Sequence, residues 1–268
     1  MAEFRGVLHV HSTLSDGALS LEEIRDWALQ EHVDFVCVTD HSGAVRGERV
    51  RQLCDDCLRL SGDVLLVPGI EFEHRGRHVV VIAPAAVLQG VSDQIAVDDP
   101  AAVRRVGGMT IWAHPSLTFS VSLRDAIAAD YDGWEVWNQR TDGSRPSLPM
   151  LRLLRRLARG RPLFPHAGLD LHALPVVPMP VYTIHSGAAH LIAGHLLEAL
   201  RHGDYVIANS HGPLTITPGE PESAVGIGTV VTSWLRHMMV RLRCVAAVVK
   251  HRIVQLAGQR RSEGDCAY

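Results

Sequence analysis

The chain has 268 residues, of which 47% are hydrophobic and 21% charged, so it is long and apolar enough for one globular domain with a sizeable core. Its formal net charge of −3 at pH 7 argues against a protein that coats nucleic acid through bulk positive charge. It also has 16 histidines, more than a hydrophobic core requires. Histidine is the commonest metal ligand and the usual acid or base near neutral pH, so the composition favours a metalloenzyme.

The cysteines and the termini narrow the class of protein further. Five scattered cysteines are an odd number and form no disulfide framework. Cys54 and Cys57 have CxxC spacing, but they lie in a helical pattern without a second CxxC, so we expect helix packing, with a redox or metal role as the alternative. We find neither a signal peptide nor an apolar run of the ~18 residues that a membrane span needs. A cytoplasmic protein is expected.

Short apolar runs alternate with amphipathic segments along the chain. Expected strands are 6–11, 35–38, 64–67, 78–82, 109–113, 133–136 and 162–164; expected helices are 20–28, 51–60, 101–106, 122–129, 148–158 and 187–200, with a loop over 175–180. The first helix has Ser20 and Glu23 at the spacing of a capping box. Apolar strands that alternate with helices predict a parallel sheet, and about seven such units favour an α/β barrel over an open sheet.

Histidine and carboxylate residues gather where the expected strands end. His9 and His11 lie two apart at a strand end, a spacing that puts both imidazoles on one side and lets both bind one metal ion. The carboxyl ends of the strands are the catalytic face of such a barrel. Imidazoles and carboxylates that converge there need cations between them, and mixed N/O ligands suit Zn, Mn or Fe. The number of ligands exceeds what one tetrahedral ion uses, so two or three ions are expected.

The order of these motifs resembles the PHP (polymerase and histidinol phosphatase) domain family. The matching segments are His9-Val10-His11, Ser15-Asp16-Gly17, Thr39-Asp40-His41, Gly69-Ile70-Glu71, His78, Ala113-His114-Pro115 and Gly168-Leu169-Asp170-Leu171-His172. The resemblance implies a distorted (β/α)7 barrel over residues 1–228 with a trinuclear metal centre. It carries ligand roles over to His9, His11, Asp16, His41, Glu71, His78, His114, Asp170 and His172. His74 also follows Glu71 closely, but His78 leads directly into an apolar strand, as the family's histidine does.

This resemblance implies a metal-dependent phosphoesterase, in which a hydroxide between adjacent ions attacks a phosphomonoester or phosphodiester. We expect Asp40 to orient a neighbouring ligand. The leaving oxygen is expected to receive its proton from a metal-bound water or from a histidine such as His166 or His211, and the sequence does not choose between them. Arg140 follows the C-terminal end of an expected strand, which is the catalytic end of the barrel, so it is placed to bind a second phosphate of the substrate. A solvated loop arginine is the alternative.

The substrate class is narrowed by a further motif. The segment Ser210-His211-Gly212-Pro213-Leu214 resembles stand-alone phosphoesterases of the family, which include nucleotide 3′,5′-bisphosphate phosphatases and 5′-3′ exonucleases on short oligonucleotides. A nucleotide or short oligonucleotide is therefore the expected substrate, and stable binding of duplex nucleic acid is not expected.

Two alternatives remain from other classes of protein. Amidohydrolases also begin their barrel with HxH, but many of them use a carboxylated lysine, and the only lysine here is Lys250. The second concerns residues 229–268, which form a basic, amphipathic helical pattern and tail. That helix can lie on an anionic membrane surface or on a partner, or its apolar face can pack on the barrel or on a second subunit.

Overall fold

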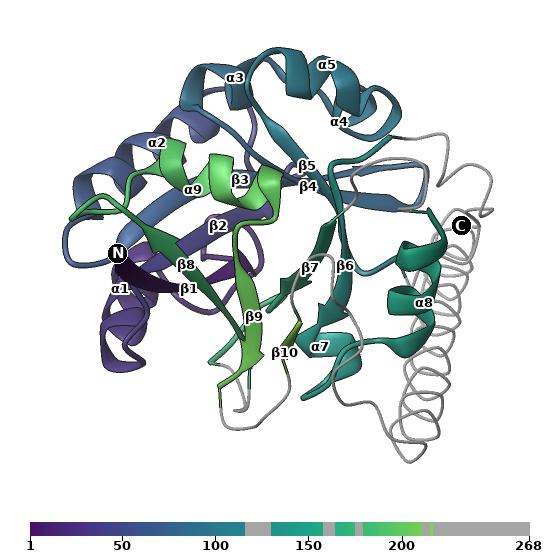
Figure 1. Cartoon of the computed structure of the whole chain (residues 1–268). Coiled ribbons are helices and arrows are strands. Elements are labelled where there is room, and N and C mark those ends of the chain that lie inside the picture. Colours follow the sequence, from purple (N-terminus) through teal and green to yellow (C-terminus); the bar gives the residue numbers. More distant parts are fainter. Residues whose placement is uncertain (116–129, 158–163, 175–178, 211–214, 217–268) are drawn as a thin grey trace, which may run out of the picture.

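The computed structural model describes residues 1–115, 130–157, 164–174, 179–210 and 215–216, in which a curved sheet is flanked by helices (Figure 1). The elements, in chain order, are β1 (Ala2–Val10), α1 (Leu21–Gln30), β2 (Phe35–His41), α2 (Glu48–Leu60), β3 (Leu65–His74), β4 (Arg77–Ile82), α3 (Ala85–Gly90), α4 (Asp93–Asp98), α5 (Pro100–Arg105), β5 (Met109–Trp112), β6 (Gly133–Asn138), α7 (Gln139–Asp142), α8 (Leu148–Leu157), β7 (Phe164–Gly168), β8 (Pro180–Ser186), α9 (Ala193–His202), β9 (Val206–Asn209) and β10 (Thr215–Ile216).

The sheet curls into a nearly closed barrel. Its strand order is β10-β9-β8-β1-β2-β3-β4-β5-β6-β7, so β1 lies inside the order and β7 at one end. Beyond β7 the chain returns to β1: the backbone N–H groups of Leu169 and Leu171 donate to the carbonyls of Leu8 and His9, at 2.9 and 3.2 Å, and His11 donates to Leu171 at 2.9 Å. These hydrogen bonds bring the two chain segments together at the end of the barrel where β1 finishes.

The expectation of a parallel sheet is wrong for part of the barrel. β1, β2 and β3 are parallel neighbours, as are β5, β6 and β7, but β4 runs antiparallel to both β3 and β5. β3 and β4 form a hairpin with the two-residue loop Arg75-Gly76, whose φ angles are +51° and +72°. Positive φ at both loop positions is typical of the tight turns that join antiparallel strands. Such turns favour asparagine, aspartate or glycine at the first position, so Arg75 did not indicate a turn in the sequence.

The C-terminal part of the described chain also differs from the expectation. The segment expected as a loop ends at Pro180, which begins β8, and β8 pairs antiparallel with both β1 and β9. The last expected helix begins later than residue 187, as α9. The expected helix over 122–129, the tail over 229–268 and His211 lie outside the described residues.

The helices bury their apolar faces against the sheet. Helix α2 places Leu53, Cys54 and Cys57 inward, which agrees with the helix-packing interpretation of the CxxC, and burial raises the pKa of the Cys54 thiol to about 11. The predicted capping box is present at the start of α1, where Glu23 N–H donates to Ser20 Oγ at 3.2 Å and Ser20 N–H donates to Glu23 Oε2 at 2.8 Å. Within the described ranges, no helix has the length and hydropathy needed to cross a membrane.

Candidate metal centre

The side chains predicted to bind metal come together at one end of the barrel. The register pairs His41 at the end of β2 with Glu71 of β3, so these two residues lie side by side. Because β4 runs antiparallel to β3, its first residues lie at this same end, and His78 pairs with Glu73. His74, the competing histidine, places its Nε2 atom 3.3 Å from Asp98 instead. The placement therefore favours His78 over His74 as a member of the site.

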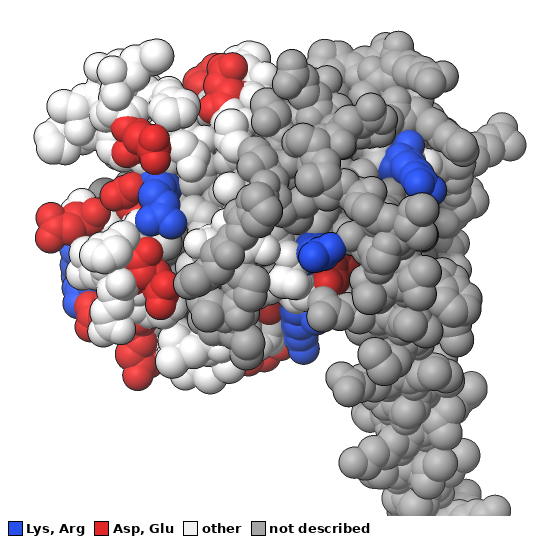
Figure 2. All heavy atoms as spheres, turned by 60° about the horizontal axis from the view of Figure 1, so that its bottom comes forward, with Lys and Arg blue, Asp and Glu red and all other residues white. Residues whose placement is uncertain are grey.

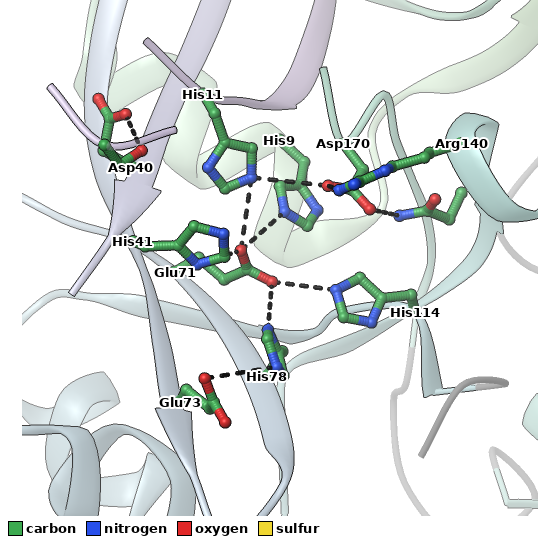
Figure 3. Close-up of polar contacts among 12 residues, drawn as sticks. His9, His11, Asp40, His41, Glu71, Glu73, His78, His114, Arg140 and Asp170 are labelled. Atoms are coloured by element: carbon green, nitrogen blue, oxygen red, sulfur yellow. Dashed lines mark hydrogen bonds and ion pairs between the residues drawn. The ribbon is translucent and has the colours of Figure 1, made fainter. Parts of the chain in front are cut away.

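Glu71 lies at the centre of the cluster, with imidazoles on both sides of its carboxylate (Figure 3). Its Oε2 atom is 3.4 Å from the Nε2 atoms of His9 and His11 and 3.0 Å from Nδ1 of His41. Its Oε1 atom is 2.9 Å from Nδ1 of His78 and 3.0 Å from Nε2 of His114. The Glu71 side chain is fully buried, so the histidines enclose a carboxylate that water does not reach.

A second group of donors lies beside His11, nearer the mouth of the site. Asp16 is half exposed, and its carboxylate is 3.1 Å from Nε2 of His172, 3.6 Å from Nε2 of His41 and 3.7 Å from Nδ1 of His11. Asp170 Oδ1 is 3.7 Å from Nε2 of His11 and 3.4 Å from Nδ1 of His172. The segments after β1 and after β7 therefore meet here, with His41 at the end of β2 beside them.

The donor atoms of the cluster fit divalent cations. Buried Nε2 of His9, both ring nitrogens of His11 and Oε2 of Glu71 have no hydrogen-bond partner among the described residues. Leaving buried polar atoms unpaired is costly, and a cation that these atoms can ligate removes that cost. Three overlapping sets each bring their donor atoms within 4.8 Å of one another: His9, His11 and Glu71; His41, Glu71 and His78; and His11, Asp16, His41 and His172.

The charges of the buried groups also favour a cation. Burial alone would raise the pKa of Glu71, but the imidazoles of His9, His114 and His78 outweigh it and hold that pKa well below its usual range. Burial would lower the pKa of His9, yet Glu135 and Glu71 raise it well above the ordinary value. Burial and the charge of His9 lower the pKa of His11 to about 2. Without metal, the protonated imidazole of His9 therefore offsets part of the carboxylate charge, while His11 stays neutral. A cation bound here would take the place of the His9 proton, because only neutral imidazoles ligate metal.

Backbone strain marks three residues of the site. His9, His114 and Asp170 have φ of +64°, +29° and +51°, which side-chain-bearing residues rarely adopt. The pairing of β1 with β2 shifts register between Val7 and Val10, so His9 lies in an irregular part of the strand. His9 and His11 do reach the same cluster, with ring centroids 5.1 Å apart, but simple strand alternation is not the reason.

Asp40 is buried and holds the loop that follows β1. Its Oδ1 atom accepts a hydrogen bond from Ser12 N–H at 2.8 Å and one from the Ser15 hydroxyl, and its Oδ2 atom accepts from Ser12 Oγ at 2.7 Å. Figure 3 places Asp40 apart from the histidines. The residue therefore fixes the segment that carries Asp16, a neighbouring proposed ligand.

His166 lies between two tyrosines of β8 and of the segment before β9. Its Nδ1 atom is 3.2 Å from the Tyr182 hydroxyl and its Nε2 atom 3.4 Å from the Tyr205 hydroxyl, and burial lowers its pKa to about 3. These hydrogen bonds join the buried imidazole to tyrosines and not to a proposed ligand, and the role of His166 as a proton donor stays a prediction. His211, the other expected proton donor, lies outside the described residues.

Arg140 lies at the rim of the cluster, as the sequence predicts. One of its terminal nitrogens is 3.3 Å from Asp170 Oδ1 and 3.1 Å from Nδ1 of His172, and 57% of the side chain is exposed. Figure 3 shows the guanidinium beside Asp170. A partly exposed guanidinium next to the donor atoms can contact an anion bound in the site.

Glu135 is a site residue that the sequence reading missed. It lies in β6, its side chain is 2% exposed, and its Oε1 atom is 2.6 Å from Nδ1 of His9. The signal was present, because a glutamate between Trp134 and Val136 in an apolar strand needs a polar partner when it is buried. The sequence does not say which partner it has.

Comparison with known proteins finds likeness in structure but not in sequence. No protein-family model and no curated protein matches the chain. A two-domain protein from Bacteroides vulgatus ATCC 8482 containing a predicted PHP-like metal-dependent phosphoesterase has a TM-score of 0.56 and 15% identity, over 88% of this chain and 70% of that one. PsfC from Pseudomonas syringae PB-5123 has a TM-score of 0.57 and 17% identity, over 90% of this chain and 100% of that one.

A third similar structure is the lesion-specific endonuclease PfuEndoQ from Pyrococcus furiosus. Its TM-score is 0.54 and its identity 13%, over 75% of this chain and 56% of that one, so this chain spans little more than half of its length. At such low identity the likeness is one of fold. The chain therefore shares the fold of a PHP-like metal-dependent phosphoesterase, which is the resemblance that its ordered motifs predict.

Proposed function

We propose that the chain is a metal-dependent phosphoesterase whose centre takes two or three divalent ions. The observation that carries this proposal is the set of buried, unpartnered donor atoms around Glu71, in a fold shared with a PHP-like phosphoesterase. Overlapping donor sets that share His11, His41 and Glu71 support more than one ion. Mixed imidazole and carboxylate donors suit Mn, Zn or Fe. The proposed ligands are His9, His11, Asp16, His41, Glu71, His78, His114, Asp170 and His172.

Each residue of the centre has a distinct task in this proposal. Divalent ions held here would polarise phosphoryl oxygens and activate water for attack on a phosphate ester. Arg140, exposed at the rim, binds oxygens of the substrate phosphate or of a second phosphate. Asp40 keeps the loop with Asp16 in place through Ser12 and Ser15. Glu71 stays ionised and holds the histidines around it.

The proposed substrate is a small phosphorylated molecule, either a nucleotide or a short oligonucleotide. In Figure 2 acidic side chains gather on the left of the face shown, and the described basic side chains lie singly. This part of the described surface therefore offers no broad basic track of the kind that binds duplex nucleic acid. A phosphomonoesterase on nucleotide bisphosphates and a 5′-3′ exonuclease on short oligomers remain the two forms of the proposal.

A substrate panel on the full chain tests the proposal. Metal-free protein is supplied with Mn²⁺ and offered p-nitrophenyl phosphate, bis(p-nitrophenyl) phosphate, a nucleoside 3′,5′-bisphosphate and a 5′-phosphorylated oligomer. We expect hydrolysis of at least one of them, and its loss in the variant with Asp170→Asn and His172→Asn. The control His195→Ala replaces an exposed histidine of α9 and should behave as wild type. Hydrolysis that survives the double substitution contradicts the proposal.

A further inference from the structure

Glu135 contacts two of the proposed ligands from behind. Its Oε1 atom accepts a hydrogen bond from His9 Nδ1 at 2.6 Å. Its Oε2 atom accepts from the backbone N–H of His114 at 2.8 Å and from Nδ2 of Asn138 at 3.0 Å. All three bonds are buried, so one carboxylate joins β1, the segment after β5 and the end of β6, and it belongs to none of the three donor sets around Glu71.

Asn138 links Glu135 to a third proposed ligand, Asp170. The same Nδ2 group that donates to Glu135 lies 3.5 Å from Oδ2 of Asp170. The amide is fixed at its other end, because its Oδ1 atom accepts from Thr141 N–H at 3.2 Å at the start of α7. Glu135 and Asn138 together therefore reach His9, His114 and Asp170.

These three residues are the ones of the site that have positive φ. His9, His114 and Asp170 adopt the left-handed region, at +64°, +29° and +51°, and a strained backbone persists only where surrounding contacts hold it. The absence of a side chain at Gly168 also leaves space for the Glu135 carboxylate. A Cβ atom at Gly168 would lie 2.1 Å from Glu135 Oε1 and 2.9 Å from His9 Cβ, so glycine is needed where β7 passes behind them.

We propose that Glu135, assisted by Asn138, is a positioning residue that holds His9, His114 and Asp170 in the strained arrangement that binds a divalent cation. The inference rests on the proposed metal centre. In the neutral imidazole that can bind a cation, the hydrogen bond to Glu135 favours the proton on Nδ1 and leaves Nε2, which is buried and unpartnered, directed toward Glu71. A carboxylate behind a histidine commonly sets the orientation and basicity of that ligand for a metal ion.

Glu135→Gln separates this role from simple packing, because the volume of the side chain is retained. When the amide oxygen faces the donors of His114 and Asn138, the amide N–H group faces His9 Nδ1 and requires that nitrogen to accept. The imidazole proton must then lie on Nε2, the atom that faces the cation site. In the other orientation of the glutamine amide, its NH₂ group faces the backbone N–H of His114, so two hydrogen-bond donors lie against each other. Neither orientation reproduces the wild-type set of bonds.

The test is calorimetric titration of the metal-free full chain with Mn²⁺, alongside thermal melting without metal. We expect Glu135→Gln to weaken Mn²⁺ binding by about 10- to 100-fold while the metal-free protein still melts cooperatively. Asp132→Asn is the matched control. It neutralises a carboxylate next to the other end of β6, where Asp132 accepts from Thr110 N–H at 2.8 Å, and it should alter the melting temperature without altering the Mn²⁺ affinity.

Wild-type affinity in Glu135→Gln, or an equal loss in Asp132→Asn, overturns the inference. Should Glu135→Gln fail to fold, Asn138→Ala keeps the carboxylate and removes its link to Asp170; we expect a smaller loss of affinity, and an unchanged affinity contradicts the inference. Hydrolysis of p-nitrophenyl phosphate is measured in parallel. A wild-type chain that binds Mn²⁺ without hydrolysing any ester overturns the proposed function alone, whereas one that binds no Mn²⁺ overturns both.

Discussion

At the scale of single residues, the centre depends on how buried charge is neutralised. Glu71 is enclosed by imidazoles, and Asp170 is held ionised although burial opposes it: His9 and His114 lower the pKa of Asp170 to about 2. His11, whose pKa is lowered to about 2, stays neutral and therefore cannot balance the negative charge of these carboxylates. Divalent cations would supply the missing positive charge and bring the unpartnered nitrogen atoms into use.

Arg140→Ala should separate substrate binding from the metal centre. The guanidinium is exposed at the rim, so its removal should raise the KM of a nucleoside bisphosphate by about 10-fold or more and change kcat little, since a charge-assisted bond contributes roughly 1.5–3 kcal/mol. Steady-state kinetics with mono- and bisphosphate substrates check this. A KM that rises equally for both classes would show that Arg140 does not read a second phosphate.

His166 should make the stability of the chain depend on pH. Its pKa is lowered from 6.5 to about 3 in the folded chain, so between these values the unfolded chain binds more protons. Its contribution to stability is complete above pH 6.5 and is lost as the pH falls toward 3. From pH 7 to pH 5 the wild type should therefore lose on the order of 2 kcal/mol more than His166→Gln. Urea unfolding at both pH values measures the difference, and parallel losses in both proteins would contradict it.

Most of the proposed ligands could be named from the sequence because they follow an apolar strand, whereas Asp16 in a loop and His78 at the start of a strand depended on the family resemblance. The sequence did not predict the backbone at His9, His114 and Asp170, because left-handed conformations of these residues depend on long-range contacts. Glu135 was missed for a related reason. Its partners, His9 and His114, come from other parts of the chain, and a single buried glutamate does not name them.

At the scale of elements, the β3–β4 hairpin decides where His78 lies. In a parallel strand, the first residue would lie at the far end of the barrel from the carboxyl ends of β1 and β2. The tight turn at Arg75-Gly76 reverses the chain, and His78 therefore reaches Glu71 at 2.9 Å. The wrong prediction of strand direction is thus compatible with a His78 that lies beside Glu71, as its proposed ligand role requires.

Arg75→Asn tests the geometry of that turn. Arg75 has φ of +51°, which asparagine tolerates better than arginine, and Asn-Gly is the favoured pair in such turns. The arginine is 72% exposed and its nitrogen lies 3.8 Å from Asp98, a surface ion pair that contributes little. We expect a gain of up to about 1 kcal/mol in the free energy of unfolding. A loss of stability in chemical denaturation would refute this account of the turn.

At the scale of the whole molecule, the barrel closes where β1 meets the segment after β7, and the metal cluster lies at that closure. β8, β9 and β10 extend the sheet on the other side of β1. From the sequence we expected a proline-rich loop over 175–180 and assigned no strand to the segments that follow it. The likeness in fold covers 88–90% of this chain in two of the similar structures. The barrel was predictable from the alternation of elements, but this extension was not.

Truncation after Gly228 tests the proposed division of the chain into residues 1–228 and 229–268. All proposed ligands lie before this point, so the shortened chain loses none of them and should keep Mn²⁺ binding and ester hydrolysis within about twofold. Co-sedimentation of both chains with anionic liposomes tests the basic amphipathic segment. Equal behaviour of the two chains would exclude membrane binding by the tail, and loss of hydrolysis would contradict the proposed boundary.

The most direct measurement is a titration of chelator-treated full-length protein with Mn²⁺, following bound metal and phosphate-ester hydrolysis in the same samples. The account predicts no hydrolysis without metal, two or three ions bound per chain, and hydrolysis that rises as the ions bind. A protein that binds no divalent ion, or that hydrolyses its ester equally well in excess chelator, would contradict it.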